Sequence, residues 1–195
     1  MGTKNTAFGY ESLTNTNIGK ENVAVGYRAL QNNQSYNGMV AIGFEAMSNF
    51  TDAFNNVNGW GVGYALSNQS SAAYSIDGFN TAIGYQSLKG SATVSNNTGL
   101  YNTAIGYQSM TGNTSGANNT ALGYQTLKTN TTGAQNVAIG QSSLSLNSTG
   151  NYNTAVGFEA LKLSTGQSND AHGYQALLNT TGSYNTALGY NTLEL

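Results

Sequence analysis

The chain lacks cysteine and proline altogether, and only 7% of its 195 residues are charged. The absence of cysteine leaves the redox compartment open, because it suits a protein outside the cell without requiring that location. Since the chain also has a single histidine, one copy can build neither a Cys–His pair nor a histidine-rich metal site. The sequence therefore offers little of the chemistry on which enzymes and metal sites depend.

Excess positive charge and long apolar runs are missing too. Six lysines and arginines stand against eight aspartates and glutamates, for a net charge of −2. Nucleic-acid binding depends on basic side chains that neutralise phosphates, so this balance argues against it. No apolar run approaches the roughly 18 residues of a membrane helix, and residues 1–5 contain no apolar signal-peptide core. We therefore expect no nucleic-acid partner and no membrane insertion.

What the chain does contain is one short repeat, present about eleven times. Its nine positions read Asn, Thr or Val, Ala, a large aliphatic, Gly, Tyr, a polar residue, Ala or Ser, and Leu, as in residues 5–13. The copies begin at Asn5, Asn22, Met39, Gly59, Asn80, Asn102, Asn119, Asn136, Asn153, Asn169 and Asn185. Their spacing is 16 or 17 residues and stretches to 20–22 around copies three to five. Such regularity argues against the disorder that a composition rich in Asn, Gly, Ser and Thr would otherwise indicate.

The length of the repeat decides the fold class. Helical repeats need about 33 residues or more for a helix pair, so this period is too short for them. Large and small side chains alternate over the first five positions, which predicts a strand, and positions six to nine predict a second short extended piece. Thr-Gly between copies predicts a turn. We therefore predict a single all-β domain over residues 1–195, a parallel β-solenoid of about eleven coils of 16–22 residues.

Stacking of coils in register places equal repeat positions on top of one another, as ladders along a rod. We expect the leucines of position nine and the large aliphatic residues of position four to fill the interior. The position-four residues are Ile42, Val62, Ile83, Ile105, Leu122, Ile139, Val156 and Leu188. Asparagine at position one predicts a hydrogen-bonded ladder, and the tyrosines of position six predict stacked rings. The small residues of positions three and five predict close approach of another backbone, across the roll or from a neighbouring chain.

Two forms of the motif resemble known families. Val40–Gly43, Val137–Gly140 and Val23–Gly26 resemble the head repeat of YadA-like trimeric autotransporter adhesins. The fuller form at Asn102–Met110 is similar to the repeats of phage tail fibres and bacterial tail-fibre-domain proteins. The resemblance implies a left-handed β-roll that forms a homotrimer, with the aliphatic residues inward and the small residues near neighbouring chains.

The same resemblance implies an extracellular protein, in a virion tail fibre or on a bacterial cell surface, that attaches to a glycan or protein receptor. The repeat is longer here than in the adhesin heads, which predicts larger lateral loops. Because the chain stops almost on a repeat boundary at Leu193–Leu195, we expect it to be a segment of a longer fibre.

Residues for chemistry are sparse and scattered. Glu11, Glu45 and Glu159 all occupy position seven, where other copies carry Gln or Arg, so they indicate an exposed polar site and not an acid–base pair. We therefore predict no enzyme and no cofactor. His172 replaces the aliphatic of position four, with Asp170 two residues before it on the same strand face. Either this histidine is simply hydrogen-bonded to Asp170, or three copies of His172 at a trimer axis bind a metal ion or an anion.

The better candidate for a binding site is where the repeat expands, over residues 48–58, 67–79 and 89–101. Aromatic rings with a few polar neighbours are typical of surfaces that bind a sugar or a protein, and insertions in solenoids tend to fall on the binding face. The candidate receptor-binding residues are Phe50, Asp52, Phe54, Trp60, Tyr74, Asp77 and Phe79. The alternative is that these aromatic residues cover the rod or pack between subunits.

Three functions are compatible with these patterns. The first is a non-enzymatic fibre or adhesin segment that forms a trimeric rod and attaches to a cell-surface receptor. The second is an ice-binding solenoid with a Thr/Asn array, although Val23, Val40, Trp60, Val137 and Asp170 interrupt the threonines of position two. The third is a purely structural spacer, for which three enlarged aromatic loops would have little use.

Overall fold

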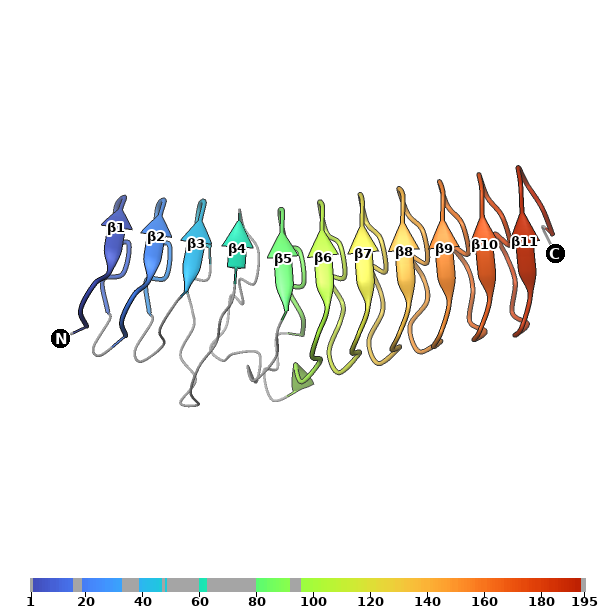
Figure 1. Ribbon diagram of the computed structural model, residues 1–195, viewed down its shortest axis with the longest axis horizontal. Helices are drawn as coiled ribbons and strands as arrows, with labels where there is room; N and C mark the ends of the chain where they lie inside the picture. The colour runs from blue at the N-terminus through green and yellow to red at the C-terminus, as the bar shows by residue number, and fades with distance from the viewer. Residues whose placement is uncertain are drawn as a thin grey trace.

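Eleven strands of three residues each begin at the second position of a repeat copy (Figure 1). The computed structural model describes residues 2–15, 19–32, 39–46, 48, 60–62 (backbone only), 80–91 and 96–193. The strands are β1 (Thr6–Phe8), β2 (Val23–Val25), β3 (Val40–Ile42), β4 (Trp60–Val62), β5 (Thr81–Ile83), β6 (Thr103–Ile105), β7 (Thr120–Leu122), β8 (Val137–Ile139), β9 (Thr154–Val156), β10 (Asp170–His172) and β11 (Thr186–Leu188).

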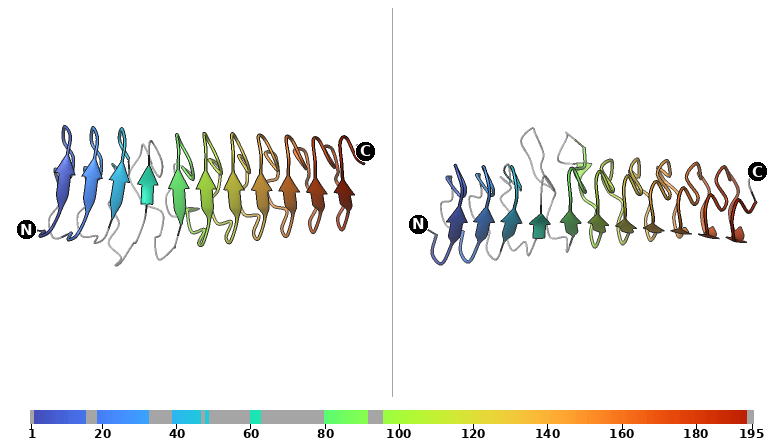
Figure 2. Two further views of the ribbon diagram at one scale, coloured as in Figure 1. Left: turned by 45° about the horizontal axis from the view of Figure 1, so that its top comes forward. Right: turned by 90° about the horizontal axis from the view of Figure 1, so that it is seen from above.

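The strands form one parallel sheet in which each strand pairs with the next along the chain, from β1 to β11. Pairing is in register, so that Ala104 lies opposite Ala121 and Ala121 opposite Ala138. The strands line one side of a rod and the connections return along the other side (Figure 2). The predicted all-β parallel solenoid is therefore confirmed. The solenoid makes about eight turns and not the predicted eleven.

The interior is narrow, and this corrects one prediction. The alanines of position three and the leucines of position nine are buried, as at Ala121 and Leu127. The position-four residues were expected inside, but those whose side chains are described point outward: Leu122 is 44% exposed and Ile139 is 36% exposed, and Val62 lies outside the described side chains. Neighbouring residues of a strand point to opposite faces, so either position three or its two neighbours must face inward. The interior of the coil has room only for the alanines of position three packed against the leucines of position nine, so the larger residues of positions two and four face outward.

Positions six to nine do not form the predicted second extended piece. They are turns, because positions seven and nine take left-handed backbone conformations, with φ of 54° at Gln125 and 45° at Leu127. These turns still hydrogen-bond from coil to coil: the Met110 N–H donates to Thr126 O at 2.9 Å, and the Gln125 N–H donates to Tyr107 O at 2.9 Å. Both sides of each coil are therefore held in register by backbone hydrogen bonds, although only one side is a strand.

The glycine of position five allows successive coils to stack closely. Its φ lies far outside the range of residues with a side chain, at 129° for Gly106 and 139° for Gly123. A Cβ atom at Gly106 would collide with the carbonyl oxygen of Gly123 in the next coil. The backbone that approaches this position is thus the next coil of the same chain, and not a segment across the roll.

The predicted asparagine ladder is present and buried. The Asn136 Oδ1 accepts the backbone N–H of Asn153 in the next coil, and the Asn136 Nδ2 donates to Gly150 O, both at 2.9 Å. Asn119 makes the same pair of bonds to Asn136 N–H and Gly133 O, again at 2.9 Å. Each asparagine therefore joins its own strand to the next strand and to a Thr-Gly turn.

A second buried asparagine ladder was not predicted. Asn113, Asn130 and Asn147 each begin an Asn-x-x-Gly turn, and the Asn130 Nδ2 donates to Asn113 Oδ1 at 2.8 Å. In the shorter copy that follows, Ser164 takes this place and its buried Oγ makes no hydrogen bond. The Asn-x-x-Gly spacing in the 17-residue copies was the available signal, since Asn is frequent in turns that bond their own backbone.

Removal of one rung of the first ladder should destabilise the rod measurably. Asn136→Ala leaves the buried backbone N–H of Asn153 without an acceptor, so we expect a loss of about 2–3 kcal/mol in the free energy of unfolding. Thr149→Ala, at an exposed turn one coil away, is the matched control, with a change within about 0.5 kcal/mol. Denaturant unfolding followed by circular dichroism measures both. Equal stability of the two variants would contradict the role given to the asparagine.

Candidate functional site

The candidate receptor-binding residues lie almost entirely outside the described part of the chain. Phe50, Asp52, Phe54, Tyr74, Asp77 and Phe79 are not described, and Trp60 is described only as backbone at the start of β4. Part of the third expanded connection is described. There the Asn97 Oδ1 accepts the Ser91 N–H at 2.8 Å and the Asn97 Nδ2 donates to Ser91 O at 3.0 Å, so this connection is tied back onto its own base.

An exposed apolar surface lies on one side of the sheet. It consists of repeat positions two and four in the strands whose side chains are described, and we call it the outer face. Its most exposed aliphatic residues are Ile42 (42%), Ile83 (36%), Leu122 (44%), Ile139 (36%) and Leu188 (80%). Thr or Val at position two lies beside them, exposed at Thr120 and half-buried at Val137. Monomeric soluble proteins rarely expose large contiguous apolar surfaces, so an apolar surface of this kind indicates an interaction site.

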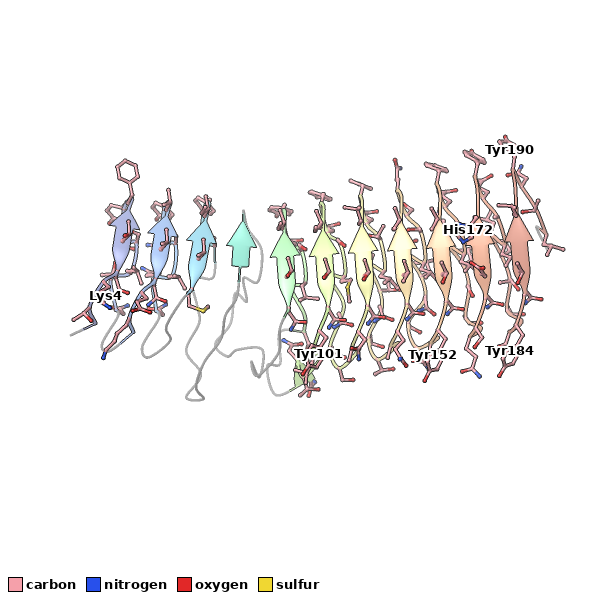
Figure 3. The ribbon with its side chains drawn as sticks, viewed as in Figure 1. Lys4, Tyr101, Tyr152, His172, Tyr184 and Tyr190 are labelled. Atoms are coloured by element: carbon pink, nitrogen blue, oxygen red, sulfur yellow. The ribbon has the colours of Figure 1, made fainter. Side chains whose placement is uncertain are left out.

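Charge enters the described outer face only in β10. His172 Nε2 lies 2.9 Å from Asp170 Oδ1, and the two side chains are 44% and 51% exposed. This carboxylate oxygen is itself shielded and accepts no hydrogen bond, so the two side chains are in contact without hydrogen-bond alignment. His172, labelled in Figure 3, lies in register between Val156 of β9 and Leu188 of β11. In the described ranges no group of three or more His, Cys, Asp or Glu comes together within one chain.

The aromatic residues of position six form what we call the ring row, at the C-terminal ends of the strands. Figure 3 shows Tyr190 beyond the end of β11. The rings stack as predicted, with centroids 4.8–5.4 Å apart and interplanar angles of 7–14°. The stacked runs are Tyr10–Tyr27–Phe44, Tyr85–Tyr107–Tyr124 and Phe158–Tyr174–Tyr190. Stacked rings support one another, and they present their edges and hydroxyl groups to solvent.

A second set of tyrosines was missed by the sequence reasoning. Tyr101, Tyr152 and Tyr184 each precede the Asn of position one, and they lie at the opposite edge of the rod from Tyr190 (Figure 3). They are 52%, 58% and 77% exposed, and each has a left-handed φ near 60°. The recurring Tyr-Asn-Thr-Ala was the available signal for an exposed aromatic at this turn.

Position seven forms a polar row beside the ring row. The Arg28 Nε donates to Glu11 Oε2 at 2.7 Å and the Gln125 Nε2 donates to Gln108 Oε1 at 2.9 Å. The hydrogen bond from Arg28 lowers the pKa of Glu11. In the same way, the hydrogen bond from Lys162 lowers the pKa of Glu159. These carboxylates belong to a polar row and not to an acid–base pair, but they are half-buried and not exposed as predicted.

Comparison of the chain with protein-family models, with characterised proteins and with solved structures finds no match. The resemblance to tail fibres and adhesin heads therefore remains a prediction that rests on the motifs themselves. In the described ranges, no helix has the length and apolar content that crossing a membrane requires.

The hypothesis of an ion at a trimer axis can be tested directly on the Asp170–His172 pair. If three copies of His172 bind a metal, the purified protein carries that metal after dialysis and the His172→Val variant loses it. Elemental analysis by mass spectrometry gives the amount per chain. Val is the matched replacement because Val156 fills this position in the neighbouring strand. A metal-free wild type, with a His172→Val variant of equal thermal stability, would rule the metal out.

Proposed function

We propose that this chain is a segment of an extracellular, non-enzymatic attachment fibre, in which three copies associate into a rod and loops on the rod bind a cell-surface glycan or protein. The observation that carries the proposal is the outer face, on which the described position-four residues Ile42, Ile83, Leu122, Ile139 and Leu188 are exposed aliphatic side chains. A monomer leaves this face in water, whereas a trimer covers it. The motif resemblance to trimeric fibres and adhesins supports the same arrangement.

The composition of the outer face suits association between identical chains. Full burial of one Leu or Ile side chain contributes roughly 1.5–3 kcal/mol. Even partial burial of this row between chains therefore contributes more to the free energy of association than many surface contacts do. Apart from Asp170 and His172, the described outer face carries no charged residue, so little desolvation of charge opposes association.

In the proposed trimer each chain is a left-handed roll, and binding is assigned to the expanded connections of copies three to five. Solenoid coils contact only their neighbours, so enlarged connections can project without disturbing the rod. The aromatic residues of residues 48–58 and 67–79 provide surfaces for a sugar ring or an apolar side chain. A plain spacer would need the rod but not these connections.

Ice binding is the second candidate, favoured by the exposed threonines Thr120 and Thr186 on a flat face. The asparagines of position one cannot take part, because they are buried in the interior. The asparagine part of the predicted Thr/Asn array is therefore wrong. The threonine row is also interrupted by valine and by Asp170. Thermal hysteresis of the purified protein separates this function from attachment.

A charge placed on the outer face should dissociate the trimer without unfolding the chain. Light scattering on the wild type should give a mass near three times 20.3 kDa. Leu122→Glu and Ile139→Glu should give a single-chain mass with an unchanged circular dichroism spectrum, because both side chains are exposed in one chain. Thr132→Glu, at an exposed turn, is the control and should remain trimeric. A wild-type chain that is monomeric at all concentrations would overturn the proposal.

Attachment itself should depend on the aromatic residues of the expanded connections. Replacement of Phe50, Phe54 and Tyr74 by serine should lower binding to an immobilised glycan panel or to bacterial cells at least about tenfold, because aromatic residues dominate binding energy at interfaces. Tyr184→Ser removes an exposed ring at a turn of the regular repeat and serves as the control. Binding by the triple variant at the level of this control would show that these aromatic residues only pack against the rod.

A further inference from the structure

The ring row is interrupted at a single copy. Position six is Tyr or Phe in ten of the eleven copies, and the exception is Gln141 in copy eight. Since β7, β8 and β9 pair in register, Gln141 follows Tyr124 and precedes Phe158 in this row. One rung separates two rings by 5.2 Å at Tyr107 and Tyr124, so the omitted rung leaves Tyr124 and Phe158 about 10 Å apart, twice the spacing of strands. We call this place the ring gap.

The position-seven side chain is shortened in the same copy. Ser142 replaces the Gln, Glu or Arg of the neighbouring copies and is only 9% exposed. Its row neighbours are Gln125 and Glu159, whose polar groups border the ring gap. Side chains of this row do reach the ring row, since the Gln86 Nε2 donates to the Tyr85 hydroxyl at 3.3 Å. Copy eight therefore lacks a ring and also has a small side chain beside it.

Copy eight and its neighbours carry hydrogen-bonding side chains at positions six and seven. Gln141 is exposed, and within the described part of the chain its side-chain amide has no hydrogen-bond partner. The Gln125 Nε2 donates to Gln108 Oε1, and within the described residues the Gln125 Oε1 accepts no hydrogen bond. Glu159 is held ionised by Lys162 and Gln175. The gap is thus bounded by two aromatic rings and bordered by amide and carboxylate groups.

This combination distinguishes between possible ligands. A purely aromatic ligand would stack between the rings but leave the amide and carboxylate groups without partners, which is unfavourable once they are covered. A pyranose ring has apolar C–H faces for the two rings and hydroxyl groups at its edge for the polar groups. Binding sites of this type are mostly apolar surfaces with a few polar groups that fix orientation.

We infer that the ring gap binds a single pyranose ring of a glycan. Tyr124 and Phe158 contact the two faces of the sugar, and the Gln141 amide, with Gln125 and Glu159, bonds its hydroxyl groups. The inference rests on the proposed attachment function for the source of the glycan. It does not depend on the trimer, because all of these residues belong to successive coils of one chain.

The test is to fill the gap with the residue that the neighbouring copies carry. Saturation-transfer NMR and titration with the methyl β-glycosides of glucose, galactose, mannose and N-acetylglucosamine provide the binding measurement. Gln141→Tyr continues the stack from Tyr124 to Phe158, so it keeps the fold while it occupies the gap, and we expect affinity to fall at least about tenfold. Gln141→Ala keeps the gap open and removes only the amide, so its affinity should fall severalfold less.

Each outcome is decisive. Binding of one glycoside that is lost in Gln141→Tyr and kept in part in Gln141→Ala supports the inference. The inference is overturned if none of the four glycosides binds, or if Gln141→Tyr binds a glycoside as well as the wild type does. Binding of indole, a purely aromatic ligand, without binding of any glycoside also overturns it. A trimer by light scattering that binds no glycoside overturns the ring gap alone, whereas a monomer that binds one overturns only the trimeric fibre.

Discussion

The structure depends on the bridge that each buried asparagine makes from one coil to the next. Its carbonyl oxygen accepts a backbone N–H of the following strand, and its amide nitrogen donates to the carbonyl of a Thr-Gly turn, as at Asn119. The bridge satisfies backbone groups that would otherwise be buried without partners, and such groups are costly. It works only if every coil places its asparagine at the same height and depth. The repeat of the sequence and the register of the sheet both follow from that requirement.

A narrow interior is the second consequence of the same constraint. Two asparagine ladders, the alanines of position three and the leucines of position nine occupy the space within the coils. Large aliphatic residues at position four have no room there and face outward. The apolar outer face is therefore produced by the way the coil closes, and it is the face on which the proposed trimer depends.

The ladders also determine how a single substitution can create a local site. In a close-packed globular core, a change from Tyr to Gln disturbs many neighbours that are unlike one another. In the ring row, Tyr124 and Phe158 lie on either side of Gln141 and are held at fixed positions along the rod by β7 and β9. The place that we propose for the sugar lies between them, where Gln141 stands instead of a ring and Gln125 and Glu159 are the neighbours in the polar row.

The sequence by itself determined the parallel solenoid, the asparagine ladder at position one and the stacked rings of position six, because strict periodicity in a stacked fold places like residues together. It could not determine which strand face is inward, since Thr-Ala-Ile alternates equally well in either sense and only the closed coil shows that Ala104 fits inside. The turn at positions seven and nine was likewise decided by the tertiary structure, because closure of so short a coil requires left-handed residues such as Leu127 where the pattern indicated extension. Periodicity specifies which residues stack on one another in successive coils, whereas the width of the coil specifies which of those residues face the interior.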